Sequence, residues 1–203
     1  IPLPFPEIPM SESGDNGVMR QECGMSQRWI DRTDSNVSST FSCVANVGTS
    51  GPSLEMPLLA TQMALGDRVT DGTNAGFLRD DALLAVVILT DEDDCSRTDN
   101  NFTIGGDQCG TNDPTFLPPS STISFLDTLT GARGRWATAV IAGPNSCSSN
   151  FGTASNAVNL QQFVAETGEN AVFSSICDGD LSTALGEAVA TFDAACRTLE
   201  PIE

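Results

Sequence analysis

The sequence predicts an α/β fold in which helices cover both faces of a mostly parallel β-sheet. Three apolar runs have the composition of buried strands, at residues 82–90, 138–142 and 171–176. Helical patterns follow the second and third runs, and short links between strand and helix favour βαβ crossovers. We therefore expect a three-layer, Rossmann-like domain with long loops.

The N-terminal part predicts an extended arm followed by the domain. Residues 1–39 are rich in Pro, Ser and Gly and form the arm, and residues 40–203 form the domain. Residues 40–47 carry a weak strand pattern. Residues 54–65 predict a helix, because their apolar side chains cluster on one side and Ser53 can cap it.

The first apolar run, residues 82–90, is the clearest element and ends in a run of carboxylates. This pattern is typical of a strand buried on both faces of a parallel sheet. A short helix is expected near residues 123–129, and another over residues 155–167. After the third strand, Asp180 is expected to cap a long helix. Its predicted apolar stripe consists of Leu181, Leu185, Val189, Phe192, Ala195 and Leu199.

Composition excludes several chemistries. The chain has no His, no Tyr and no Lys, and its nine Arg face 27 Asp and Glu, which gives a net charge of −18. Without His or Lys, the common nucleophile–base pairs and the P-loop lysine are absent. A surface this acidic repels phosphate backbones, so we expect no nucleic-acid partner. Carboxylate, hydroxyl and thiol chemistry is what remains.

The seven cysteines indicate disulfides and an oxidising compartment. A helix of the expected length keeps Cys177 and Cys196 roughly 22 Å apart, far beyond bridging distance. The predicted pairs are Cys147–Cys177, Cys95–Cys109 and Cys23–Cys43, and they leave Cys196 free and buried on its helix or paired to a missing segment. No run is long enough to span a membrane. We therefore expect an exported protein, located in the periplasm, at the outer membrane or outside the cell.

The three strand ends carry polar residues that should meet on one rim of the sheet. These segments are residues 91–94, 143–146 and 178–180. The carboxylates of the first and third segments would repel one another unless a cation or strong solvation relieved them. A second, calcium-like loop is conceivable, although an ordinary polar loop is the simpler interpretation. Its candidate ligands are Asp99, Asn100, Asn101, Asp107 and Asp113.

The sequence resembles a von Willebrand factor A (vWA) domain, as found in exported lipoproteins of myxobacteria and related bacteria. The resemblance covers roughly residues 40–199, and its most specific part is Thr90 to Ser96. The matching segments are Phe41–Cys43, Gly48–Thr49, Glu55–Ala60, Asn74–Asp81, Leu84–Ser96 and Ser175–Asp178.

The resemblance implies a divalent cation, Ca²⁺ or Mg²⁺, at a metal-ion-dependent adhesion site. Asp91 matches the family's aspartate at the end of the fourth strand, and Thr49 matches its threonine. Asp93 and Asp94 are further candidate ligands beside Asp91. The family's Asp-x-Ser-x-Ser loop and the strand before it have no counterpart here. That strand could come from a second chain, from a rewired N-terminal arm, or from a segment trimmed off.

These observations lead to one expected function and two alternatives. The expectation is a non-enzymatic, cation-dependent binding or adhesion module that holds a protein or glycan ligand at the rim. The first alternative is a metal-free structural or assembly protein. The second is a hydrolase that uses paired carboxylates, although a sugar-binding cleft usually displays more aromatic side chains than the two Trp of this chain provide.

Overall fold

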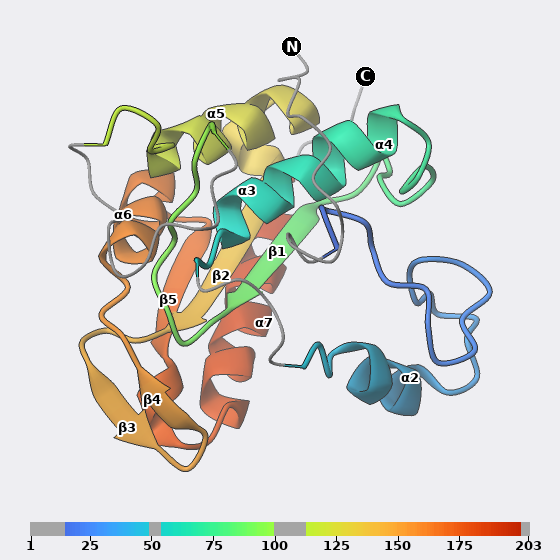
Figure 1. Cartoon of the computed structure of the whole chain (residues 1–203). Coiled ribbons are helices and arrows are strands. Elements are labelled where there is room, and N and C mark those ends of the chain that lie inside the picture. Colours follow the sequence, from blue (N-terminus) through green and yellow to red (C-terminus); the bar gives the residue numbers. More distant parts are fainter. Residues whose placement is uncertain (1–14, 49–53, 100–112, 200–203) are drawn as a thin grey trace.

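The protein is an α/β structure built around three parallel strands, as the sequence predicts (Figure 1). The computed structural model describes residues 15–48, 54–99 and 113–199. Its main sheet contains β1 (Leu84–Leu89), β2 (Trp136–Ala142) and β5 (Ala171–Ser175) in the order β1-β2-β5. All pairings in this sheet are parallel. The carboxyl ends of the strands therefore lie at one end of the sheet.

The central strand β2 is buried at every position, whereas β1 is not. Along β1, buried or half-buried residues alternate with exposed ones, and Val87 is 48% exposed and Leu89 54%. The prediction that this strand is buried on both faces was therefore wrong. The reason is that β1 lies at the edge of the described sheet, beyond the strands that α7 covers.

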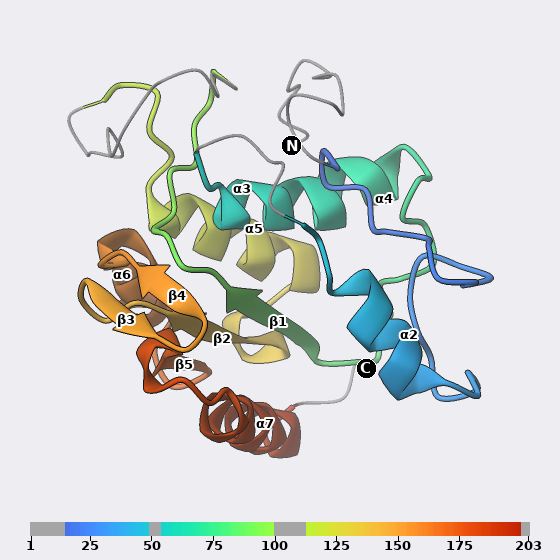
Figure 2. The same cartoon turned by 60° about the horizontal axis from the view of Figure 1, so that its bottom comes forward.

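One face of the sheet is covered by α3 (Pro57–Gln62), α5 (Pro119–Thr130) and α6 (Val158–Thr167), and Figure 2 shows α7 (Ser182–Arg197) on the other side. The main core lies under the first group, where Trp136 stacks on Phe163 with ring centroids 6.2 Å apart. The indole Nε1 of Trp136 donates to Asp127 at 2.8 Å, which satisfies its buried polar atom.

The helix α7 packs through small residues, and of the predicted apolar stripe only Ala195 is among its buried residues. Its buried residues are Ala184, Ala188 and Ala195, while Leu185 and Val189 are 48% and 66% exposed. The sheet beneath it also presents small residues, because Ala137 and Ala139 of β2 are fully buried on that face. Small residues on both surfaces let helix and sheet approach closely, so the larger side chains lie outside the contact.

Two further elements differ from the sequence prediction. Residues 40–47 were expected to form a strand, but Val37–Val44 is a helix, α2, in which apolar side chains recur at helical spacing and none is buried. The helix expected over residues 54–65 is α3, which continues as the π-helical turn η1 (Met63–Asp67) and as α4 (Arg68–Thr70). Its predicted cap, Ser53, lies outside the described residues.

The connecting loops add a hairpin and two short turns, one before β2 and one after β5. The hairpin consists of β3 (Cys147–Ser149) and β4 (Gly152–Ala154), and the 3₁₀ turns are η2 (Arg133–Arg135) and η3 (Ile176–Asp178). None of the helices in the described part of the chain combines the length and apolar character needed to cross a membrane.

The disulfides follow the predicted pairing where it can be seen. Cys23 is joined to Cys43, and Cys147 is joined to Cys177. Cys95 is also disulfide-bonded, but its predicted partner, Cys109, lies outside the described residues. Cys196 is free and exposed, so the expectation that a free Cys196 would be buried was wrong.

Candidate functional site

The three strand ends meet on one rim, which is the candidate functional site. Ser155, after the hairpin, donates its backbone N–H to the carbonyl of Asp91 at 2.8 Å. The Cys147–Cys177 disulfide ties the hairpin to the end of β5. Gly143 allows Ser155 to approach this closely, because a Cβ at position 143 would collide with the carbonyl of Ser155. The rim is therefore held by backbone contacts and by one disulfide.

Asp93 caps the N-terminus of α6. Its carboxylate accepts backbone N–H bonds from Asn159 at 2.9 Å and from Leu160 at 3.1 Å. The N-cap residue of α6, Ala157, makes no side-chain capping bond, so the anion at position 93 satisfies the helix terminus instead. Burial raises the pKa of Asp93, while the backbone N–H groups act in the opposite direction.

Asp94 caps the N-terminus of α3. Its Oδ1 accepts the N–H of Leu58 at 2.9 Å and the hydroxyl of Ser96 at 2.8 Å. The same Ser96 hydroxyl accepts the N–H of Leu59 at 2.9 Å. Asp94 is fully buried, and burial raises its pKa to about 6. Two neighbouring carboxylates thus anchor two different helices to the end of β1.

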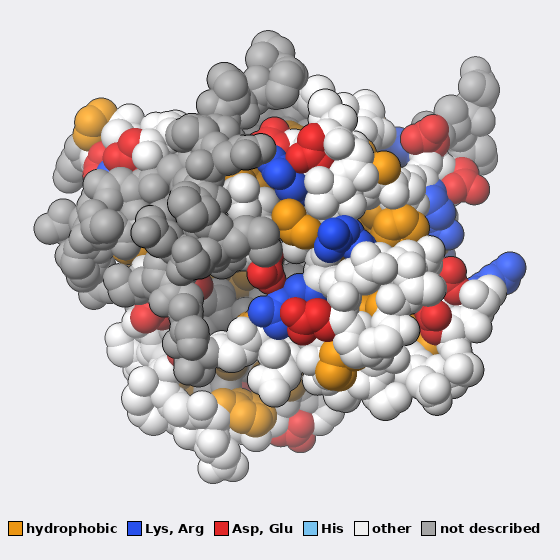
Figure 3. Space-filling view, turned by 45° about the vertical axis from the view of Figure 1, so that its right-hand side comes forward, with side chains coloured by type: hydrophobic (Ala, Val, Ile, Leu, Met, Phe, Trp, Pro, Cys, Tyr) orange, Lys and Arg blue, Asp and Glu red, His pale blue; other side chains and the backbone are white. Residues whose placement is uncertain are grey.

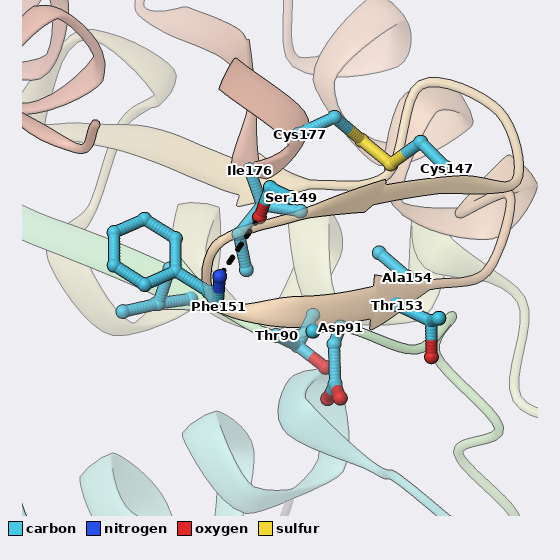
Figure 4. A pocket seen from close by; sticks show the side chains of 11 residues that line it. Thr90, Asp91, Cys147, Ser149, Phe151, Thr153, Ala154, Ile176 and Cys177 are labelled. Carbon is cyan, nitrogen blue, oxygen red and sulfur yellow. Dashed lines mark hydrogen bonds between the residues drawn. A yellow bond between two sulfur atoms is a disulfide. The ribbon is translucent and has the colours of Figure 1, made fainter. Parts of the chain in front are cut away.

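Asp91 is placed differently, because it is exposed and lines a hollow of about 220 Å³ between β1 and the hairpin. In Figure 4 the side chains of Thr90 and Asp91 point away from the Cys147–Cys177 disulfide. The same hollow is lined by Leu89 and Phe151, and Phe151 is 58% exposed. Exposed apolar and acidic side chains therefore adjoin at this position.

The charge around Asp91 is negative. Glu55 precedes α3, and its pKa is raised by partial desolvation and then by the charges of Glu92 and Asp91. Like charges within reach of one another disfavour ionisation, so this corner of the rim favours a positively charged group.

The described residues do not assemble a metal site from the four predicted ligands. Asp93 and Asp94 direct oxygens to helix N-termini, and Thr49 lies outside the described residues. In the described ranges, no three Asp, Glu, Cys or His side chains are grouped closely enough to hold a metal ion. Only Asp91 keeps a carboxylate that is directed to no helix terminus.

The loop after the rim contains a buried arginine that the sequence did not single out. Arg97 is 3% exposed, and its guanidinium contacts Asp99 at 2.9 Å and Asp113 at 2.7 Å. Hydrogen bonds from Thr115 and then from Arg97 lower the pKa of Asp113 to about 2. Two of the five candidate ligands of a second calcium-like loop therefore serve an ion pair, while Asn100, Asn101 and Asp107 lie outside the described residues.

Other rim residues that sequence reasoning missed are Phe151 and the exposed face of Leu89. Nothing in their local pattern marks them, because Phe151 lies in a polar loop and Leu89 belongs to a continuous apolar run. Asp180, expected to cap the long helix, accepts the N–H of Ser182 at 2.9 Å.

Comparisons of the chain with models of known protein families, with curated proteins and with solved structures find no match.

Proposed function

We propose that the chain is a non-enzymatic binding module of an exported protein and that it holds a protein or glycan at the strand-end rim. One observation carries this proposal: a single hollow combines exposed Leu89 and Phe151 with the acidic Asp91. Exposed apolar side chains bordered by polar ones are typical of interaction sites. Disulfides in the loops support an exported location.

The chemistry of the rim favours a partner that has a basic group next to an apolar one. The apolar part would cover Leu89 and Phe151, and the basic group would lie near Asp91, Glu92 and Glu55. Aromatic side chains that become buried often contribute most to such interfaces. In this proposal the charge of the rim selects the partner and the apolar hollow supplies affinity.

The divalent cation implied by the vWA resemblance is not needed in this form of the proposal. A cation-dependent form would require ligands other than Asp93 and Asp94 beside Asp91, because those two carboxylates hold α6 and α3. The three-layer vWA architecture likewise remains a proposal, supported by the parallel sheet and the helices on its two sides.

The test is binding of the labelled protein to glycan and peptide arrays, with Ca²⁺ and Mg²⁺ or with EDTA. We expect the wild type to bind ligands on the arrays and the variant Phe151→Ser to bind the same ligands at least about fivefold more weakly. Binding should fall less on Asp91→Asn and should survive EDTA. Asp81→Asn makes the same charge change at the opposite end of β1 and is the matched control.

Three results would count against this form of the proposal. Loss of binding in EDTA would restore the cation-dependent form. Equal effects of Asp91→Asn and Asp81→Asn would mean that only net charge matters. Absence of any bound glycan or peptide would contradict the rim as a binding site.

A second candidate function is assembly with another polypeptide without a metal. The observation that favours it is the outer edge of β1, where Val87 and Leu89 are about half exposed although they belong to an apolar strand. This edge is distinct from the hollow at the rim, although Leu89 contributes to both.

A further inference from the structure

We propose that the outer edge of β1 is a docking site for an extended, proline-free segment of a partner polypeptide, which adds to the sheet as a further strand. This inference rests on the assembly function proposed above and names the structural element that assembles. It is carried by the backbone of β1, by the side chains of β1 and by one flank of α7.

The backbone of β1 offers an edge for pairing. In the part of the chain that the structure describes, β1 is the terminal strand of the sheet, and its neighbour is β2. Thr90 donates its N–H to Ile141 at 3.1 Å, and backbone groups of parallel strands alternate in direction. The backbone groups of Ala85, Val87 and Leu89 therefore point away from β2. Within the described ranges, no backbone hydrogen bond reaches these three residues, and such an edge is a template for another strand.

The side chains of the same residues form the start of an apolar surface. Leu89 lies beside Ile141 in the register, and Val87 lies beside Ala139, so all four side chains belong to one face of the sheet. Ile141 and Ala139 are each 1% exposed, whereas Val87 and Leu89 are 48% and 54% exposed. The apolar face that is buried on β2 thus continues onto β1, where its side chains are exposed.

The helix α7 provides a second apolar wall beside that row. Ser174 of β5 donates its hydroxyl to Glu187 at 2.5 Å, so the flank of α7 that carries Glu187 lies on the β5 side. Leu185 and Val189 are each two residues from Glu187, about 200° around the helix, so they lie on the flank toward β1. Both are exposed, at 48% and 66%. A strand added beside β1 could therefore cover apolar side chains of both elements.

A hollow at the amino end of β1 leaves room for the end of such a strand. It measures about 630 Å³ and is lined by residues 29–33, 76–79 and 82–85. Trp29 and Phe77 contribute aromatic surface there, in an edge-to-face contact with centroids 6.3 Å apart. Figure 3 views the molecule from the side on which β1 lies in the sheet, and hydrophobic side chains emerge there between acidic and basic ones.

Charge indicates the kind of occupant. Asp80 and Asp81 precede β1, and Asp91 and Glu92 follow it. A second copy, with its net charge of −18, would bring the same acidic residues to this edge. The arm at residues 1–9 carries Glu7 and no Arg, so its charge does not complement these carboxylates. The edge therefore fits a partner's segment with alternate apolar side chains and basic residues at its ends.

The test is fluorescence anisotropy of the purified chain with a short synthetic peptide, in which Val and Ile alternate with Thr and each end carries Lys. We expect binding that weakens at least about tenfold when the central Ile of the peptide is replaced by Pro. Replacement of the terminal Lys by Glu should also weaken it.

The protein variants are matched by exposure. Val87→Glu should weaken binding at least about tenfold, whereas Val37→Glu, on α2 and 46% exposed compared with 48% for Val87, should leave it unchanged. Circular dichroism checks that Val87→Glu is folded. If it is not, Leu185→Gln on α7 replaces it in the same binding test.

The other outcomes separate this inference from the assembly function. Equal binding of the proline peptide would overturn strand addition but leave an apolar assembly surface. A dimer without peptide that Val87→Glu dissociates would identify a second copy as the occupant and overturn the partner's segment. No binding of any peptide by a monomeric chain would overturn both.

Discussion

β1 and β2 are neighbours in one parallel sheet and have similarly apolar sequences, but their surroundings differ. β2 is buried at all of its positions, because α7 covers one face and the helices α5 and α6 cover the other. β1 is buried or half-buried on the face toward the main core and exposed on the other. The difference teaches that an apolar run predicts a strand but not its burial, because burial depends on which elements pack on each face.

The carboxyl ends of the same two strands are also held by different means. The end of β1 is fixed by side chains, since Asp93 and Asp94 accept N–H bonds from α6 and α3. The end of β2 is fixed by backbone, since Ala157 donates its N–H to the carbonyl of Gly143 at 2.9 Å. A strand that is half exposed thus carries the side-chain anchors of two helices at its end.

The largest expected effect compares the register partners Ile141 and Leu89. Ile141→Ala should lower the free energy of unfolding by about 2–5 kcal/mol, because it empties a fully packed position. Leu89→Ala should cost less than about 1 kcal/mol, because its side chain is 54% exposed. Urea unfolding followed by circular dichroism measures both. Equal losses would show that the face of β1 is covered in solution.

The second prediction concerns pH and the anchor at the end of β1. The pKa of Asp94 is raised from 3.8 to about 6, so the folded chain binds a proton more tightly than the unfolded chain. The contribution of Asp94 to stability is therefore most favourable below pH 3.8 and declines as the pH rises through about 6. Relative to Asp94→Asn, the wild type should lose about 2 kcal/mol between pH 4 and pH 6.5.

Unfolding of both proteins by urea across this pH range measures the difference. Since burial also raises the pKa of Asp93, the comparison with Asp94→Asn, rather than the wild-type curve alone, isolates Asp94. A difference that is constant with pH, or that grows in favour of the wild type as the pH rises, would contradict the burial of Asp94 as a charged group.

Most of the fold could be predicted from the sequence because strand and helix periods are local. The apolar runs predicted β1, β2 and β5, and the helix expected over residues 155–167 is α6, which ends at Thr167. The predicted stripe of α7 was wrong at Leu185 and Val189, because helical spacing alone does not say which side of a helix meets a sheet of small residues. The strand expected at residues 40–47 was wrong because a segment this short does not distinguish the period of a strand from that of a helix.

Less of the site could be predicted, because the roles of its carboxylates depend on tertiary contacts. Asp91, Asp93 and Asp94 form one acidic run, yet Asp93 reaches an amide 66 residues away and Asp94 one 36 residues away. No local pattern distinguishes them from the exposed Asp91. The pairing of Cys147 with Cys177 was predictable, because the ends of adjacent parallel strands must lie close together.

The smallest expected effect is at Val189, which tests whether the exposed flank of α7 contributes only when the edge of β1 is covered. Val189→Thr keeps the shape of the side chain and should change the free energy of unfolding by less than about 0.5 kcal/mol, because the residue is 66% exposed. The adjacent Ala188→Thr is the matched control, since Ala188 is 2% exposed and should be destabilised by about 1–3 kcal/mol. With the strand-forming peptide in excess, the wild type should gain stability by mass action and Val189→Thr should gain less. A loss above about 1 kcal/mol in Val189→Thr without peptide would instead show that this flank is already packed in the isolated chain.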